Sequence, residues 1–459
     1  AFAGLLLPVG ALGDRYGRKI TLLGGLALFA TASLAATVVT NAGGLIAARA
    51  VLGAAAAILT PLTLANLPVL FTPDERPRAL AVTVMATGVG VPFGPLVGGL
   101  LLEHFWWGSI FLVNVPVAVI AFVAVAALVP ESRDAEPRGV DWLGALLSTV
   151  GLVGVVYAVI EAPSRGWSDP IVVGTLAAGL AIVAAFVASV RHASRGTRVT
   201  PTIDLHLFTD RRFLFGSLCA TVSSFALFGL LFVLPQYLQE VRGNNAFGTG
   251  LRLIPLMAGL IVGARGGERV GRRWGTKAGV ATGLTVIAVA LAIGATTSAT
   301  SGYGFVAAWL VLLGIGTGAA LTPAMDAVLG ALPPDRAGSG TALTMTFRQV
   351  GAALGVAVLG SVLASVYQGA MRADPRVPAS ASGVAQQSVA AAHDIATAAR
   401  DAAVARAGDS AYLAAMDRVL LVCAIVTLAG ALAAVIGLPV RARTAVGAEE
   451  SAYEPADIA

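Results

Sequence analysis

The sequence predicts an all-α protein that crosses a membrane many times and consists of two similar helical bundles. Three observations support this prediction: charged residues are scarce, apolar runs of membrane-spanning length follow one another, and the two halves of the chain repeat. Of the 459 residues, 57% are hydrophobic and 12% are charged, whereas soluble domains carry about 25% charged residues. This composition excludes a water-soluble core and suits a protein solvated by lipid.

The apolar runs define the expected helices. A helix needs about 20 apolar residues to span the hydrocarbon core, and the chain holds about 13 such runs. They cover 1–12, 20–40, 44–70, 79–102, 109–129, 142–161, 170–190, 213–238, 250–265, 278–297, 303–331, 341–366 and 418–440. The chain begins at Ala1 inside the first run, so we expect a further helix upstream.

The basic residues predict the orientation. Most Lys and Arg residues fall in alternate connections, which are therefore expected to be cytoplasmic, and the protein is expected in the plasma membrane. The opposite side carries Trp106, Trp167 and Tyr303, which are typical interfacial aromatics. One long connection, 367–417, belongs to this outer side. Its residues 383–407 form either a helix against the outer face or a loosely ordered loop.

The chain repeats itself at a spacing of about 260 residues, which is typical of a fold with internal repeats. The segment Gly13–Lys19 returns as Gly271–Lys277, and Leu59-Thr60-Pro61 returns as Leu321-Thr322-Pro323. We expect two six-helix bundles related by an axis along the membrane normal, with substrate bound between them. The predicted divisions are 1–130 for the first bundle without its first helix, 131–200 for two inserted helices, 201–443 for the second bundle with the outer segment 367–417, and 444–459 for a cytoplasmic tail.

Two motifs are candidates for conformational change. The first is a connection in which two glycines permit a tight turn and basic residues surround one acid; its residues are Gly13, Asp14, Arg15, Gly17, Arg18 and Lys19. Such a connection can bind a neighbouring helix in one conformation and release it in another, although basic residues at a cytoplasmic turn also occur without this role.

The second motif is a glycine-rich helix. Glycines at i, i+4 and i+8 line one face and permit close backbone contact, while prolines bend the helix. Its residues are Gly90, Pro92, Gly94, Pro95, Gly98 and Gly99. This helix could be a pivot and a seal between the halves, or it could simply be tightly packed.

These residues resemble a known family. Gly13–Lys19 is similar to the loop signature of the major facilitator superfamily, and Gly88–Gly99 resembles the signature of its drug:proton antiporters. Further similarity to the 14-helix branch lies at Arg49 with Gly53, Trp107–Pro116, Asp204–Phe208 and Phe347–Gly351. The resemblance implies an exporter of quaternary ammonium or methyl viologen type, whose first helix usually carries an acidic residue. One departure is Arg272, which stands where the first half has Asp14.

Ionisable residues within the apolar runs are candidates for proton coupling, because charge in hydrocarbon is costly. Asp326 lies about six residues, or about 9 Å, from the end of its run, and could exchange a proton or simply pair with an Arg at the interface. Arg49 cannot lose its proton; it could act on a nearby carboxylate or extend to the surface. Arg252 and Arg348 raise the same question.

The substrate cavity is predicted from one helix above all. Phe225, Phe228 and Phe232 follow helical spacing and could hold a lipophilic cation, or they could be core or lipid-facing residues. The other candidates, which are polar or flexible residues near the expected centre, are Gln236, Tyr237, Met85, Asn114 and Met325.

Together these features predict a secondary transporter that exports small hydrophobic or cationic compounds in exchange for protons. An exporter of an endogenous metabolite or antibiotic is the alternative. A membrane-embedded enzyme would need a GxSxG elbow or a catalytic dyad, and an ATP-driven pump would need a GxxxxGK[ST] loop, neither of which we find. We expect no cofactor or metal, no nucleic acid, buried packing roles for Cys219 and Cys423, and a monomer in the lipid bilayer.

Overall fold

The computed structural model describes residues 5, 16–66, 70–72, 75, 90, 94, 96–132, 142–193, 205–332, 337–378 and 383–439. Every regular element in these ranges is a helix. Ten of these helices are long and apolar enough to cross a membrane. This is the expected all-α membrane architecture, because a spanning helix satisfies all its backbone groups internally where no water is available.

In the first half, the structure describes two long helices and a third span formed by two consecutive helices. Helix α2 (Arg18–Val38) packs against both α3 (Ala42–Ala65) and α7 (Asn114–Leu128), and the short α6 (Ser109–Leu112) precedes α7. Small residues allow the close approach of α2 and α3: a Cβ built at Gly25 would lie 2.6 Å from the Ile58 side chain. The opposite face of α7 is exposed, as expected for a helix that faces lipid.

The second half is a six-helix bundle. Its long helices are α10 (Arg211–Gln236), α12 (Ile254–Trp274), α13 (Thr276–Gly294), α14 (Tyr303–Gly330), α15 (Ala337–Ala373) and α18 (Ala402–Gly437). Helix α10 contacts α14, α15 and α18. Short helices join or flank these spans: η1 (Leu205–Thr209), η2 (Tyr237–Val241), α11 (Ala246–Arg252) and α17 (Val389–Ala399).

Glycines set the spacing of α12 and α14. A Cβ built at Gly259 or Gly263 would lie only 2.2 or 2.1 Å from a backbone oxygen of α14. Gly314 and Gly318 of α14 approach α12 equally closely. Helices in lipid associate through such close packing, since burial of apolar surface drives them together less than it does in water.

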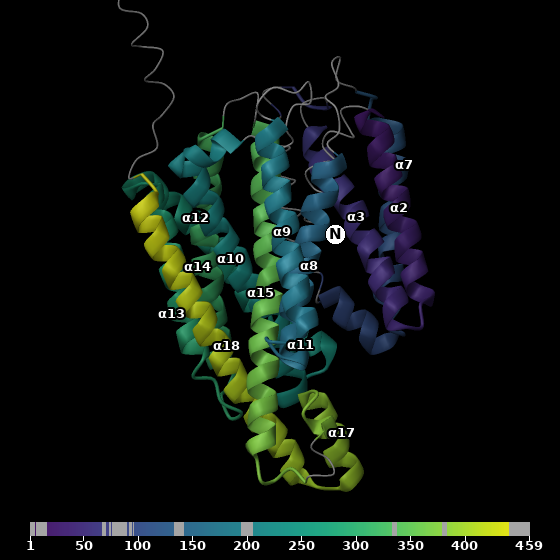
Figure 1. Ribbon diagram of the computed structural model, residues 1–459, viewed down its shortest axis with the longest axis vertical. Helices are drawn as coiled ribbons and strands as arrows, with labels where there is room; N and C mark the ends of the chain where they lie inside the picture. Colours follow the sequence, from purple (N-terminus) through teal and green to yellow (C-terminus); the bar gives the residue numbers. More distant parts are fainter. Residues whose placement is uncertain are drawn as a thin grey trace, which may run out of the picture.

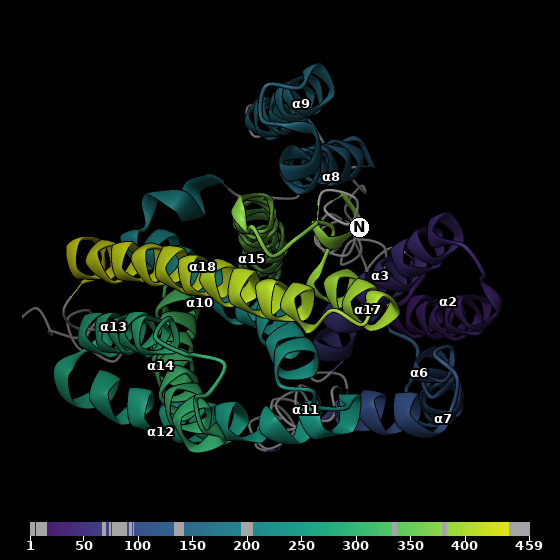
Figure 2. The ribbon, with the colours of Figure 1, turned by 90° about the horizontal axis from the view of Figure 1, so that it is seen from below.

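Two further helices lie between the halves in sequence but outside them in space. Helices α8 (Trp142–Arg165) and α9 (Pro170–Ala193) form a pair, and α8 packs against α15. Viewed along the helices, this pair lies at the edge of the molecule beside α15, with α9 further out than α8 (Figure 2). Its exposed apolar side chains include Leu143, Leu146 and Leu180.

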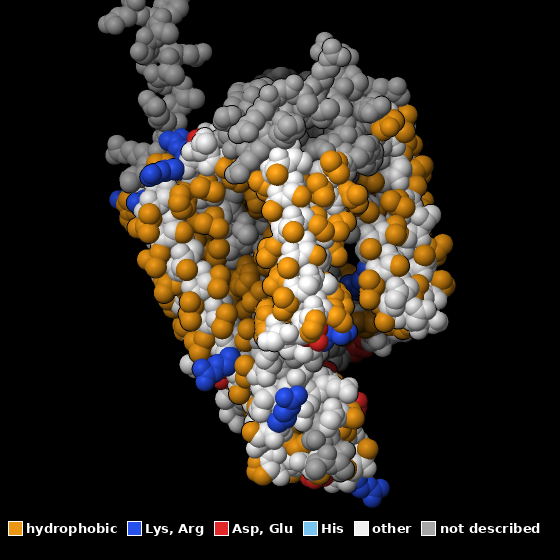
Figure 3. Space-filling view, viewed as in Figure 1, with side chains coloured by type: hydrophobic (Ala, Val, Ile, Leu, Met, Phe, Trp, Pro, Cys, Tyr) orange, Lys and Arg blue, Asp and Glu red, His pale blue; other side chains and the backbone are white. Residues whose placement is uncertain are grey.

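The two ends of the molecule differ. The basic end, as we name it, is where α2, α10 and α13 begin and where Arg18, Arg211 and Arg273 lie. The opposite end, which we name the α17 end, extends beyond the other helices (Figure 1). Between them, apolar side chains cover the middle of the visible face, and basic side chains gather toward its two ends (Figure 3).

At the α17 end, the helices are longer than expected. Helix α15 continues to Ala373 rather than ending at 366, and α18 begins at Ala402 rather than 418. The expected helix over 383–407 is divided, because Arg400 adopts a left-handed conformation and the Asp401 side chain accepts from Ala403 N to start α18. Buried Val389, Ala392 and Ala396 hold α17 in the same apolar core as α18.

Candidate functional site between the two halves

The halves meet at the α17 end through a glycine and an amide. Gly99 lies in the helical stretch 96–104, and a Cβ built there would be 2.6 Å from the carbonyl oxygen of Ala246. Four residues on, Glu103 Oε1 accepts a hydrogen bond of 2.8 Å from Asn245 Nδ2. We call these contacts, made by Gly99, Glu103, Asn245 and Ala246, the outer seam. They hold a helix of the first half against the start of α11.

Asn245 joins this seam to the local fold. Its Oδ1 atom accepts from Gly248 N at 2.8 Å, which caps the first turn of α11, while its Nδ2 atom reaches Glu103. One amide therefore starts a helix in one half and binds a carboxylate of the other. Neither Glu103 nor Asn245 was identified as a site residue from the sequence. The one available signal was that Asn245 is a residue type that often caps a helix, and that it lies in a short connection.

The rest of the glycine motif is only partly described. Gly90, Gly94 and Gly98 have no heavy atom of the described residues within 4 Å of a built Cβ. Pro92 and Pro95 lie outside the described residues. Within the described part, the predicted seal between the halves is thus represented by Gly99 alone.

The predicted gate loop lies against the end of α7. Gly17 has φ 107°, a conformation that favours glycine, and it precedes α2. Arg18 N donates to Ser132 O at 3.0 Å, and Lys19 Nζ donates to Ala126 O at 2.8 Å. Lys19 thereby places a cation at the carboxyl end of α7, where the helix dipole favours it. Gly13, Asp14 and Arg15 lie outside the described residues.

The structure does not bring the two proton-coupling candidates together. The Arg49 guanidinium lies over the Phe111 ring at 5.4 Å from its centroid, seven residues into α3. Asp326 lies 23 residues into α14, exposed, with Glu268 of α12 as a charged neighbour. At 1.5 Å per residue, their depths differ by about 24 Å along these helices.

The aromatic stripe of α10 packs partly against α15 and is partly exposed. The backbone of Phe225 and the ring of Phe232 pack on glycines of α15, at Gly355 and Gly360. Phe228 and Phe232 are each 39% exposed, so both side chains remain partly uncovered.

The remaining cavity candidates lie in different parts of the structure. The Gln236 amide donates to Phe232 O, and Tyr237 is fully buried with its hydroxyl on Ser298 O. Tyr237 lines a pocket of about 120 Å³ at the α17 end together with Arg242, Arg252 and Tyr303. Met325 packs against the core of the second bundle, Asn114 begins α7 and is partly buried, and Met85 lies outside the described residues.

Another polar contact lies deep in the second bundle. Arg348 of α15 donates from Nε to the hydroxyl of Ser224 on α10 at 3.3 Å. Ser224 is 2% exposed, so this guanidinium enters the bundle rather than leaving it. The sequence raised Arg348 as an intramembrane charge without identifying its neighbour.

The comparisons with known proteins agree with this architecture. The family model of the Major Facilitator Superfamily matches residues 1–356. The multidrug efflux pump LfrA of Mycolicibacterium smegmatis is 32% identical over 96% of this chain and 86% of that protein. The tetracenomycin C resistance and export protein of Streptomyces glaucescens is 31% identical over 80% of this chain and 67% of that protein. The methyl viologen resistance protein SmvA of Salmonella typhimurium is 32% identical, with coverage of 81% and 74%.

Solved structures share the fold. A bacterial homologue of the human lysosomal transporter Spinster, in an inward-facing and unoccupied conformation, superposes with a TM-score of 0.60 at 16% identity, covering 95% of this chain and 90% of that one. The peptide transporter PepTSo superposes with a TM-score of 0.58 at 14% identity, with coverage of 95% and 88%. The expected fold and family are confirmed. This chain belongs to the Major Facilitator Superfamily and is a membrane transporter rather than an enzyme.

Proposed function

We propose that this transporter exports small hydrophobic compounds across the plasma membrane by alternating access, driven by inward movement of protons. The observation that carries the proposal is its similarity to exporters, foremost to the multidrug efflux pump that aligns with 96% of the chain. The basic end is then cytoplasmic, following the distribution of Lys and Arg. The driving force is the proton gradient, and one chain is the functional unit.

The outer seam gives the proposed cycle a mechanical element. With the seam closed, the space between the halves opens toward the basic end and receives substrate. Breaking the Glu103–Asn245 hydrogen bond and separating Gly99 from Ala246 would open the opposite side. A single hydrogen bond contributes only about 0.5–1.5 kcal/mol, so binding energies of ordinary size can shift this equilibrium.

Proton coupling is assigned to Asp326. It is the acidic residue of α14, and its charged neighbour Glu268 is also acidic. An acidic side chain within a membrane-spanning helix is a candidate for accepting and releasing the coupled proton. Arg49 is a fixed cation in the other half and contributes charge without titrating.

The test is transport by the full-length protein in proteoliposomes with an imposed proton gradient, using methyl viologen and a neutral hydrophobic dye as probes. We expect concentrative transport that stops when an ionophore collapses the gradient. Transport that continues unchanged without the gradient would show that the coupling is wrong. In the Asp326→Asn variant we expect normal membrane insertion and reduced gradient-driven transport, whereas wild-type transport would assign Asp326 to structure.

A second function is export of an antibiotic made by the host cell. Its support is that other relatives are named as export proteins for tetracenomycin C and cephamycin. Growth tests separate the two functions. Broad sensitivity to dyes and biocides on deletion favours multidrug export, while intracellular accumulation of one endogenous compound favours the second function.

A further inference from the structure

A permanently charged group lies near the middle of the second bundle. Arg348 is 11 residues from the start of α15, which is about 16 Å at 1.5 Å per residue. Its partner Ser224 is 13 residues from the start of α10. Since the hydrocarbon core is about 30 Å thick, both lie near its centre. A guanidinium cannot lose its proton, so this position carries a full positive charge.

The contacts of Arg348 leave that charge without a counter-ion. Its Nε atom donates to the Ser224 hydroxyl, which is neutral. Among the described residues, no carboxylate lies within 4.0 Å of its guanidinium. An unpaired charge in a low-dielectric interior costs several kcal/mol, and intramembrane charges of this kind usually belong to a functional site.

The acids of α14 and α18 are too far along the bundle to pair with Arg348. Asp326 lies beside Ala324 and Val328, which contact Gly216, and Gly216 is eight residues or about 12 Å below Ser224 on α10. Asp417 of α18 is 13 residues, about 20 Å, from Gly430, which contacts Val222. The counter-ion is therefore not supplied by these helices.

The surroundings suit an aromatic compound that carries an acid. Within the described part of the chain, the two terminal nitrogens of the guanidinium have no hydrogen-bond partner, so they can make the paired hydrogen bonds that a carboxylate accepts. Phe228, one turn beyond Ser224 on α10, is 39% exposed. Contacts on other sides of α10 are made by Gly216 with α14, Gly229 with α15 and Val222 with α18. An aromatic ring packed on Phe228 would place its acidic group toward Arg348.

We propose that Arg348 binds the acidic group of the transported compound, so that aromatic acids are preferred over permanent cations of the same shape. This inference rests on the proposed export function and names its substrate class. A fixed cation attracts a carboxylate and repels a quaternary ammonium group, which gives discrimination in both directions. It therefore reverses the preference for cations that the resemblance to quaternary ammonium exporters implies.

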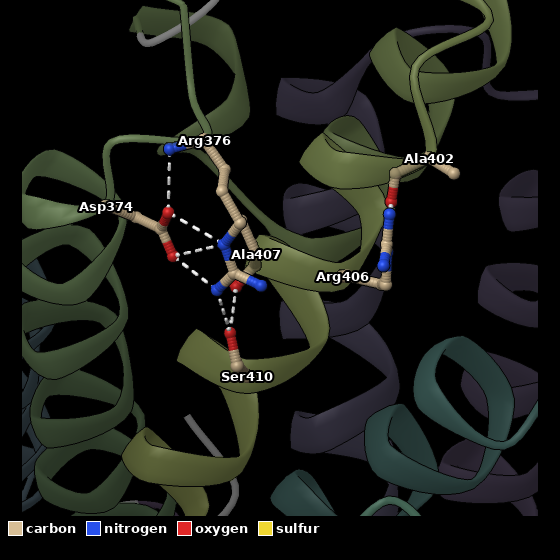
Figure 4. Close-up of polar contacts among 6 residues, drawn as sticks. All are labelled: Asp374, Arg376, Ala402, Arg406, Ala407 and Ser410. Carbon is tan, nitrogen blue, oxygen red and sulfur yellow. Dashed lines mark hydrogen bonds and ion pairs between the residues drawn. The ribbon is translucent and has the colours of Figure 1, made fainter.

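The experiment measures binding and transport separately. The full-length protein in lipid nanodiscs is titrated with 2-naphthoate and with (2-naphthyl)trimethylammonium, which share a ring system and differ in charge. We expect tighter binding of the acid, weakened roughly tenfold or more in Arg348→Gln and less in Arg348→Lys, because a bond to a charged group is lost. Affinity for the cation should stay the same or increase in Arg348→Gln. Arg406→Gln is the matched control, since Arg406 is exposed on α18 and donates to Ala402 O of its own helix (Figure 4).

A second variant keeps the inference testable if Arg348→Gln does not fold. Ser224→Ala removes the acceptor of the Nε bond without changing charge, and it should weaken acid binding by a smaller factor than Arg348→Gln. Equal acid affinity in wild type and Arg348→Gln, or preferential wild-type binding of the cation, would overturn the inference. If Arg348→Gln does not fold, unchanged acid affinity in both Arg348→Lys and Ser224→Ala overturns it. Gradient-driven transport of the cation without acid binding would refute this inference and leave the export function intact. Arg348-dependent acid binding without any transport would support the binding role of Arg348 and refute the export function.

Discussion

The two halves of the molecule share a turn but use it differently. Gly17 before α2 has φ 107°, and its counterpart Gly275 before α13 has φ 90°. After the first glycine, Lys19 binds the carboxyl end of α7. Before the second, Arg272 pairs with Glu268 on its own helix, with both side chains largely exposed. The repeat has kept the backbone geometry, whereas the anchor to another helix is found in the first half.

Packing differs as well. In the second half, Gly259, Gly263 and Gly267 bring α12 against the backbone of α14. In the first half, Gly99 instead contacts the other half through the outer seam. Close glycine packing thus joins α12 to α14 within the second half, and through Gly99 it also joins the two halves. The first kind should be needed for folding, and the second for the transport cycle.

The largest expected effect is on the α12–α14 contact. Gly263→Val would place a methyl-bearing carbon 2.1 Å from Ile315 O, so the two backbones must separate. Overpacking of this kind costs about 1–3 kcal/mol or more, and we expect a lower Tm and less folded protein by size-exclusion chromatography. Gly266→Val on the same helix meets nothing within 4 Å among the described residues and is the matched control. Equal stability of the two variants would contradict the assigned packing.

The next effect concerns the asymmetric anchor. Lys19→Gln removes the cation from the end of α7, where such a charge contributes about 0.3–1 kcal/mol. We expect transport to fall by roughly two- to five-fold in proteoliposomes while the amount of folded protein stays unchanged. The control is Lys277→Gln at the matching position of the second half, with a smaller effect. If both substitutions reduce transport equally, the two turns are equivalent and the comparison fails.

An effect of comparable size is expected at the outer seam. Glu103→Ala removes one hydrogen bond, worth about 0.5–1.5 kcal/mol, without removing the α11 cap made by Asn245. We expect a larger population with the halves separated at the α17 end, measured by distances between spin labels placed on either side. An unchanged distance distribution would mean that the bond does not hold the seam.

The smallest effect is a pH dependence at the α17 end. Arg376 hydrogen-bonds Asp374 at 2.9 Å (Figure 4) and holds the pKa of that carboxyl below its usual value. Because the folded pKa is lowered, the pair stabilises the chain above the ordinary carboxyl pKa, and this stabilisation is lost as pH falls through the lowered value. Because the Arg376 side chain is 43% exposed, solvent weakens the pair and we expect only a small effect. When Tm is measured from pH 3 to 7, it should fall less steeply at low pH in Asp374→Asn than in the wild type. An identical pH dependence in the two proteins would show that the pair does not stabilise the chain.

The sequence predicted what periodicity and composition determine. The spanning helices of the second half agree with the apolar runs within a few residues, with three exceptions. Helix α12 continues to Trp274 rather than ending at 265, α11 and α12 are divided, and α15 and α18 are extended at the α17 end. Those extensions were missed because Ala-rich turns outside hydrocarbon have a helix propensity but no long apolar run. The turn at Gly17 and Gly275 followed from the repeat, because a positive φ needs glycine at both positions.

Contacts between side chains of different helices were harder to predict from the sequence. Arg49 and Asp326 were grouped by chemistry, yet they occupy different depths of different halves. The Glu103–Asn245 bond joins residues 142 apart in sequence, and no local pattern encodes such a pair. Arg348 was visible as a charge within an apolar run, but its hydroxyl partner on α10 required the packing of two helices through Gly351 and Gly355.

In the proposed cycle, the two halves separate and rejoin at the outer seam during transport. The most direct measurement is transport by a Glu103→Cys, Asn245→Cys double variant before and after a short thiol-specific cross-linker, in protein whose buried Cys219 and Cys423 are retained. We predict that cross-linking stops transport, that a reducible linker restores it on cleavage, and that each single-cysteine variant is insensitive. Full transport by the completely cross-linked chain would contradict the account.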